Sequence, residues 1–398
     1  MAAERFELVM ERIEKITEQT DVPEVFDDYF KKTAQFLLQL RDITKKAEAD
    51  TLKNASLAEC EQQNASIYAD IMAEHYGQSY GNPAYAVEKL GEEYGAILSA
   101  LYAECRKHIK DAFAAKKMNV TIASELFVEI YNYFEEKEGI DKTAIEQAIY
   151  WYFHDYSEIF LGEAIREIVD AEEDFLYGIV MNADLTDLRY LYQYGEHIGE
   201  NETGIAAFLN AMSEEEIQAM ADTYTEGYRI GFAATGKDLS KKTTAQVRYP
   251  IGFERMVRAA VKNLEKLNLK VTMRAYSSAA NKQYDYDHKE DKALYYDKAY
   301  VERRLEVMKT TYEEFKKMAN GQAGPAVIEV FGETPFSPET KKEVLKLNEK
   351  QQQLSVYDMS MSGQITNQYI IGEERSFTII AYPVPQIGDK FKEIFAKT

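Results

Sequence analysis

The densest group of potential metal-binding side chains lies at residues 285–291, where the sequence is DYDHKED. The group consists of Asp285, Asp287, His288, Glu290 and Asp291. Carboxylates together with one imidazole can bind a hard divalent cation. However, successive side chains of one short segment rarely converge on a single point, and Lys289 adds a positive charge among them. We therefore predict a solvated acidic loop, with a metal site as the alternative.

A second group would place an imidazole and several carboxylates along one helix. Its members are His154, Asp155, Glu158, Glu163 and Glu167. A metal site between helices also needs an ExxH pair on another helix, and the sequence has none. These residues are therefore predicted to form a solvated helix face.

Motifs of the common catalytic sites are absent from the sequence. None of the histidines (His75, His108, His154, His197 and His288) lies in an HExxH pattern. There is no GxSxG, no GxxxxGK[ST] and no GxGxxG after a strand. We therefore assign no catalytic, cofactor-binding or metal-binding residue to this chain, and we expect residues 1–398 alone to be inactive as an enzyme.

The composition restricts the partners and the compartment. The chain has 47 basic and 68 acidic residues and a net charge of −21, which repels nucleic acids and anionic membranes. The densest basic segment, 237–248, holds no aromatic residue for base stacking. No apolar run approaches the roughly 18 residues of a membrane span, and the first residues lack the pattern of a secretory signal. Cys60 and Cys105 form no CxxC pair, as is usual in a reducing compartment. We expect a cytoplasmic protein that binds neither nucleic acid nor membrane.

Residues 1–200 are predicted to form an all-helical domain. Phe6, Val9, Ile13 and Ile16 recur at the spacing of one helix face. A second apolar stripe follows the break at Pro23, and Asp141 is a predicted N-cap. The tyrosines between 150 and 194 are expected on half-buried helix faces, with sugar or peptide recognition as the alternative.

At residues 199–204 (GENETG) the sequence changes from helical patterns alone to alternating strand and helix patterns, and we predict a domain boundary there. Predicted strands lie at 247–251, 271–276, 326–332 and 377–382, and helices lie at 253–267, 293–319 and from Ser337 onward. Ser213 and Glu216 form a predicted capping box. Alternating strands and helices predict a mainly parallel sheet of about four strands, covered by helices on both faces, over residues 205–398. The predicted fold class is thus α + α/β.

The order of segments from about residue 217 onward resembles a known family. A helix, a glycine-containing turn and a strand (MADTYTEGYRIGFAATGKDLSKKTTAQVRYPIG) precede a helix and strand (FERMVRAAVKNLEKLNLKVTMRAYSS). A long helix and strand (YVERRLEVMKTTYEEFKKMANGQAGPAVIEVFG) come next, and the segment RSFTIIAYPVPQIGDKFKEIF ends the pattern with a phenylalanine-bearing helix. This order resembles the N-terminal domain of the thermophilic-metalloprotease-type aminopeptidases, the aminopeptidase T and leucyl aminopeptidase group, over about residues 217–398.

The resemblance implies a cytosolic metallo-aminopeptidase that removes N-terminal residues from peptides, possesses a pair of zinc, cobalt or manganese ions and forms a homodimer. The family has no helical domain like residues 1–200, and its metal ligands lie in a second, C-terminal domain without a counterpart here. The resemblance thus implies the front part of such an enzyme, with 274–291 and 332–337 as the loops where an open α/β sheet receives a ligand. The alternative is a non-catalytic binding or assembly module.

Overall fold

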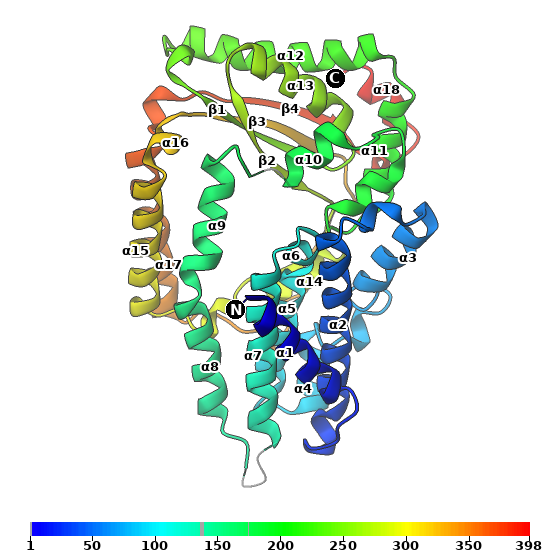
Figure 1. Cartoon of the computed structure of the whole chain (residues 1–398), viewed down its shortest axis with the longest axis vertical. Coiled ribbons are helices and arrows are strands. Elements are labelled where there is room, and N and C mark those ends of the chain that lie inside the picture. Colours follow the sequence, from blue (N-terminus) through cyan, green and yellow to red (C-terminus); the bar gives the residue numbers. More distant parts are fainter. Residues whose placement is uncertain (1, 136–138, 174) are drawn as a thin grey trace.

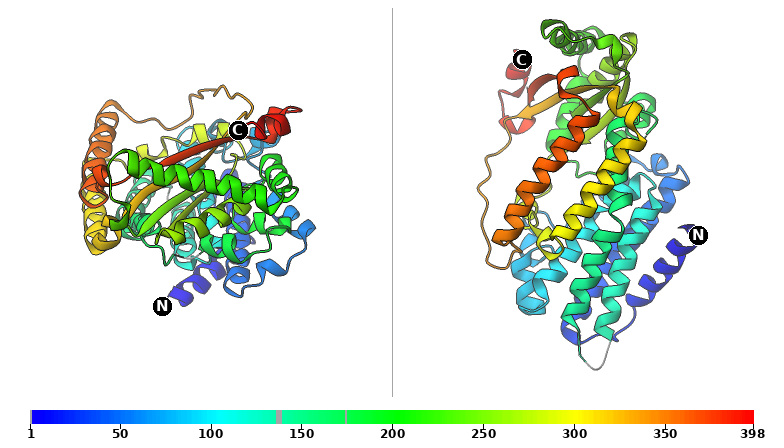
Figure 2. Two further views of the ribbon diagram at one scale, coloured as in Figure 1. Left: turned by 90° about the horizontal axis from the view of Figure 1, so that it is seen from above. Right: turned by 90° about the vertical axis from the view of Figure 1, so that its left-hand side faces the viewer.

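The computed structural model describes residues 2–135, 139–173 and 175–398. The molecule is elongated, with a sheet and its covering helices at one end and a bundle of helices at the other (Figure 1). Long helices run between the two ends along one side (Figure 2). A helical N-terminal part followed by a parallel α/β part confirms the predicted fold class. None of the described helices has both the length and the apolar character that a membrane crossing requires.

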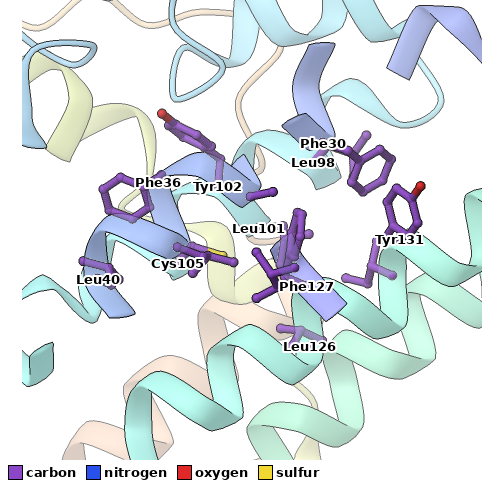
Figure 3. Close-up of a cluster of buried hydrophobic side chains, with 14 of the residues drawn as sticks. Phe30, Phe36, Leu40, Leu98, Leu101, Tyr102, Cys105, Leu126, Phe127 and Tyr131 are labelled. Carbon is purple, nitrogen blue, oxygen red and sulfur yellow. The ribbon is translucent and has the colours of Figure 1, made fainter. Parts of the chain in front are cut away.

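Seven helices of the described chain build the N-terminal part. They are α1 Ala2–Ile16, α2 Glu24–Glu48, α3 Leu57–Tyr68, α4 Pro83–Leu90, α5 Gly95–Lys107, α6 Ile109–Phe113 and α7 Lys117–Glu135. The predicted apolar stripe of α1 is buried, from Phe6 to Ile16, and Pro23 is the N-cap of α2. Three of the helices interlock at the centre of this part (Figure 3). The side chains involved are Phe30, Phe36 and Leu40 of α2, Leu98, Leu101, Tyr102 and Cys105 of α5, and Leu126, Phe127 and Tyr131 of α7.

A layer of long helices joins the two ends of the molecule. It consists of α8 Lys142–Asp155, α9 Ser157–Val169, α15 Lys298–Glu314 and α17 Glu349–Tyr369. Asp141 caps α8 as predicted, because its carboxylate accepts the backbone N–H groups of Thr143 at 2.9 Å and Ala144 at 3.2 Å. Helix α15 packs between α9 and α17, and Ile165, Leu305 and Ile365 from the three helices share one buried cluster. Helices from both halves of the sequence thus form one layer.

Residues 199–204 begin a helix and do not form an extended linker. Helix α11, Glu200–Asn210, starts directly after Gly199, whose N–H is accepted by the carboxylate of Glu202 at 2.8 Å. The buried cluster of the α/β end also includes Ile179 of α10 (Phe175–Asn182) and Tyr190. The packing of the α/β part therefore extends to residues before 199, and a boundary at 199–204 stays a prediction for proteolysis.

The described strands form one parallel sheet in the order β2-β1-β3-β4. Their bounds are β1 Thr244–Pro250, β2 Lys270–Tyr276, β3 Gln322–Phe331 and β4 Thr378–Pro383. All four lie within a few residues of their predicted positions. The strands pair in parallel as predicted, because each connection is long enough to return to the same end of the sheet.

The two faces of the sheet are covered differently. Helices α12 (Glu214–Ala234) and α13 (Glu254–Lys266) cover one face (Figure 1) and enclose Ala245, Val247 and Tyr249 of β1. The helices of the later crossovers, α15 and α17, project away from the sheet and pack against each other and α9. The prediction of helices along both faces is therefore only half right. The second face remains partly open, with polar side chains of β1 and β2 on it.

Of the two helix starts predicted at Ser213 and Ser337, the first is confirmed and the second is wrong. The Ser213 hydroxyl accepts the Glu216 N–H at 3.2 Å, and the Glu216 carboxylate accepts the Ser213 N–H at 2.8 Å, which confirms the capping box. No helix begins at Ser337, because residues 333–348 form a mostly exposed connection. Helix α17 instead starts after Asn348, which makes its own capping box with Gln351.

The closing segment packs onto the sheet as the sequence pattern suggests. Helix α18, Phe391–Phe395, follows β4 and the turn at residues 384–390. Its Phe395 ring lies 4.7 Å from the ring of Phe208 and 4.7 Å from the ring of Tyr382, measured between centroids. The phenylalanines therefore attach the end of the described chain to α11 and β4.

Candidate functional site

The position where an open α/β sheet usually binds a ligand is filled here by the chain itself. The strand order reverses between β1 and β3, and their carboxyl ends would normally frame a ligand crevice. After β1, a Cβ at Gly252 would lie 2.8 Å from the carbonyl oxygen of Glu202, and after β3 a Cβ at Gly332 would lie 2.9 Å from the side chain of Ile387. The Gln386 N–H also donates to Asn201 at 3.2 Å. Helix α11 and the turn after β4 thus close this position.

A crevice remains beside it, at the carboxyl end of β2. It has a volume of about 330 Å³ and lies between the sheet end and helices α5 and α6. The loop after β2 forms one wall with Ser277 and Ser278, and residues 195–197 form another. This loop belongs to the ligand-receiving segment 274–291 that the sequence predicts, so the crevice is the candidate site.

The cationic side chains around the crevice already have partners. Arg106 donates to Asp70 and to the carbonyl of Ile67, both at 2.8 Å. Lys107 donates to Glu104 at 2.7 Å, and Lys110 forms an ion pair with Glu196. These charges are largely balanced within the protein, so they attract an incoming anion weakly.

Two groups in the crevice wall lack a hydrogen-bond partner within the described chain. The Asp285 side chain is exposed and its carboxylate has no hydrogen bond or ion pair with any described residue. Partial desolvation raises its pKa, although nearby His288 opposes the rise. The Nδ1 atom of His197 is buried and has no partner in the described part of the chain. Burial also lowers the pKa of His197, which favours a neutral ring that can donate and accept. The crevice therefore offers one unpaired carboxylate, whereas the unpartnered nitrogen of His197 is covered by the protein.

The crevice wall is held in place by Glu202 of α11. Its carboxylate accepts the backbone N–H of Ser278 at 2.7 Å and that of Gly199 at 2.8 Å. The Asn201 amide also donates to the Ser278 hydroxyl at 3.0 Å. The loop after β2 is thus fastened to α11, and the Ser278 hydroxyl has a fixed position in the crevice wall.

The prediction of a solvated loop at residues 285–291 holds for the exposed Asp285 and Lys289 but is wrong for the residues around Asp287 and His288. Asp287 is buried at the end of α14 (Lys282–Asp287) and accepts hydrogen bonds from Tyr76 at 2.6 Å, Gln283 at 2.7 Å and Lys341 at 2.5 Å. The two ring nitrogens of His288 face Asp291 at 2.7 Å and the carbonyl of Gly81 at 2.6 Å. These groups fasten the α/β end to the helical end and leave no free ligand set for a metal ion.

The other predicted candidates are also separated. A one-residue break at Tyr156 divides His154 and Asp155 on α8 from the three glutamates on α9. Glu158 pairs with Arg303, while Glu163 and Glu167 both pair with Lys116. Three or more His, Cys, Asp or Glu side chains do not gather in a metal-binding geometry anywhere in residues 2–135, 139–173 and 175–398. The residues of the described chain thus do not fit a paired-metal site.

Sequence reasoning did not identify Glu196, His197 or Glu202 as site residues. The local sequence signal for this segment is a pair of flanking glycines. Gly195 adopts a positive φ of +67°, and Gly199 directly precedes α11. Comparisons with protein-family models, curated proteins and solved structures gave no match to this chain. The function must therefore be argued from the chain's own residues.

Proposed function

We propose that this chain is the substrate-holding part of a cytosolic metallo-aminopeptidase. The order and direction of the elements support this proposal. The strands at 244–250, 270–276, 322–331 and 378–383 are parallel and connected by helices, and a phenylalanine-bearing helix ends the unit. This is the arrangement that the resemblance implies for residues 217–398. The family's metal pair would be bound by residues outside 1–398, and no chemical step is assigned to the residues described here.

The crevice beside β2 gives this proposal a specific role for Asp285. A peptide substrate of an aminopeptidase presents a free α-ammonium group, and an unpaired carboxylate is a suitable partner for it. The volume of about 330 Å³ lies at the lower end of the range for small-ligand pockets. The Ser278 hydroxyl lines the same crevice and accepts a hydrogen bond from Asn201, so it can still donate a hydrogen bond to the first peptide bond. The proposed function of the crevice is to hold the amino-terminal end of a short peptide.

The test compares a short peptide with its N-acetylated form. Calorimetric titration of the purified chain with Leu-Gly-Gly is expected to give binding at least about tenfold tighter than with acetyl-Leu-Gly-Gly, because acetylation removes the charge that Asp285 binds. Asp285→Asn should abolish this preference. Asp389→Asn is the matched control, because Asp389 is an exposed aspartate in the turn after β4. A preference that survives in Asp285→Asn would contradict the role of the crevice.

The second candidate function, an assembly module, is favoured by exposed apolar side chains on α17. Val356 is 64% exposed and Met359, one turn further, is 66% exposed. Large apolar groups on one helix face are typical of a contact surface, and a second copy of this chain is the partner we propose. Light scattering after gel filtration should show a dimer, and the double substitution of Val356→Glu and Met359→Glu should give a monomer. A monomeric wild-type chain would exclude this function.

A further inference from the structure

A second hollow lies on the open face of the sheet, away from the crevice. It has a volume of about 640 Å³ and is enclosed by β1, β3 and helices α9, α15 and α17. It exists because α15 and α17 project away from the strands that they connect. Three cationic side chains line it, namely Lys237, Arg248 and Arg375, and no aspartate or glutamate is among its described lining residues.

The arginines of this hollow lack charge partners. Arg248 donates from Nε to the Gln246 amide oxygen at 2.7 Å and has no other described partner. The side chain of Arg375 makes no hydrogen bond or ion pair within the described ranges, although Lys237 donates to its backbone carbonyl at 2.5 Å. Arg274 is the direct neighbour of Arg248 in the register of β1 and β2, and it is also unpaired in the described structure. In a chain with a net charge of −21, arginines are expected to find carboxylates easily.

Unpaired arginines side by side are unfavourable without a ligand. Like charges directly opposite each other on neighbouring strands repel, and strands in a sheet lie about 4.8 Å apart. Burial, together with the charges of Arg274 and Arg375, lowers the pKa of Arg248. Glu329 is two residues beyond Val327, the β3 partner of Arg248, and forms no ion pair with Arg248 in the described chain. An anion bound between the guanidinium groups would remove the repulsion.

The helix-side wall of the hollow is mostly apolar, whereas Gln246 and Gln322 line it from the sheet. Its walls include Leu161, Ile165 and Ile168 of α9 together with Met308 and Tyr312 of α15. Because the cations come from β1 and from the connections after α12 and before β4, whereas the apolar groups come from α9 and α15, a ligand with two chemically different ends fits best. We propose that this hollow binds a small organic anion, with a phosphate or carboxylate group between the arginines and an apolar group against α9 and α15. This site does not depend on the proposed peptidase function.

The test uses hexyl phosphate, hexanoate and uncharged hexanol as probes for calorimetric titration of the whole chain. We expect binding of at least one of the two anions, weakened by salt, and no binding of hexanol. Whichever of the two anions binds more tightly shows whether the site prefers a phosphate or a carboxylate group. The double substitution of Arg248→Gln and Arg375→Gln should weaken binding at least about tenfold. Arg229→Gln is the matched control, because this arginine lies on α12 and pairs with Glu226.

The stability of the ligand-free variants gives an independent readout. If the unpaired arginines serve a ligand and not the fold, the double variant should melt at the same temperature as the wild type or higher. The reason is that the substitutions remove the repulsion between the guanidinium groups. Arg375→Gln alone, outside the strands, keeps the binding test possible if the double variant does not fold. The proposal is overturned if neither anion binds, if hexanol binds equally well, if Arg229→Gln weakens binding as much, or if a double variant that still folds melts at a much lower temperature than the wild type.

Discussion

Glu254, the first residue of α13, has a fully buried carboxyl group. One of its oxygens accepts the Tyr190 hydroxyl and the Gly252 N–H, both at 2.8 Å, and the other has no partner in the described structure. Burial raises the pKa of Glu254 from 4.5 to about 7, although hydrogen bonds to the carboxylate oppose the rise. Glu254→Gln keeps the shape and one acceptor oxygen but removes the titration. We therefore expect it to change how stability depends on pH.

The sign and size of the effect follow from the two pKa values. Because the pKa is higher in the folded protein, the contribution of the protonated carboxyl to stability is complete below pH 4.5 and is lost as the pH rises through about 7. At about 1.4 kcal/mol per pH unit, the gap corresponds to on the order of 3 kcal/mol. Glu254→Gln should thus stabilise the protein relative to the wild type by up to this amount at pH 8. Near pH 4.5 the advantage should disappear.

The assay is thermal unfolding, followed by circular dichroism, of both proteins at pH 5 and pH 8. The expected result is a melting temperature of Glu254→Gln that exceeds that of the wild type by a few degrees at pH 8 and by much less at pH 5. Glu215→Gln is the control, because Glu215 is an exposed glutamate in the first turn of α12. An equal difference between Glu254→Gln and the wild type at both pH values would refute the reasoning.

Three further predictions concern other parts of the chain. Burial alone would lower the pKa of His108, but the hydrogen bond to Asp111 and the nearby carboxylate of Glu104 raise it to about 9. Its contribution to stability should therefore be complete below pH 6.5 and be lost as the pH rises through 9. His108→Gln should weaken the pH dependence of the free energy of unfolding between pH 7 and 10, and an unchanged pH dependence would contradict this. The purified chain should bind no tight metal pair and should not cleave a leucine-type chromogenic substrate with zinc, cobalt or manganese; turnover that follows metal content and is lost when Asp287 and His288 become Ala would show that residues 285–291 are catalytic. Brief treatment with the non-specific protease proteinase K should cut first in the connection before α17, where Phe336 is 41% exposed, whereas a first cut at 199–204 would support two separately folded halves.

The elements that could be predicted from the sequence are those whose signal is local. The spacing of the apolar residues from Phe6 to Ile16 is sufficient to predict α1, because one face of this helix is buried against a single layer of neighbours. The β-branched and aromatic runs of β1 to β4 identify buried parallel strands for the same reason. Asp141 and Ser213 were predictable as caps because each bonds only within its own first turn.

The errors arise where distant residues decide the structure. Nothing near Asp287 indicates that Tyr76 and Lys341 will satisfy its carboxylate, since these partners are 211 and 54 residues away in the chain. The Ser337-Pro338 pair has the chemistry of a helix start, but the connection bonds to α14 instead, and the Gln283 side chain accepts the Glu339 N–H at 2.9 Å. The unpaired state of Asp285 and Arg248 is likewise a property of the packed chain, not of the local sequence.

The proposal that the crevice binds a free amino terminus is tested most directly by the pH dependence of peptide binding. The α-amino group of a peptide loses its proton near pH 8, so the charge that Asp285 binds disappears above that pH. Calorimetric titration of the wild-type chain with Leu-Gly-Gly should give an affinity about tenfold lower at pH 9 than at pH 7, while the weaker binding of acetyl-Leu-Gly-Gly stays constant. Equal affinities for both peptides at pH 7, or no binding of either, would contradict the account.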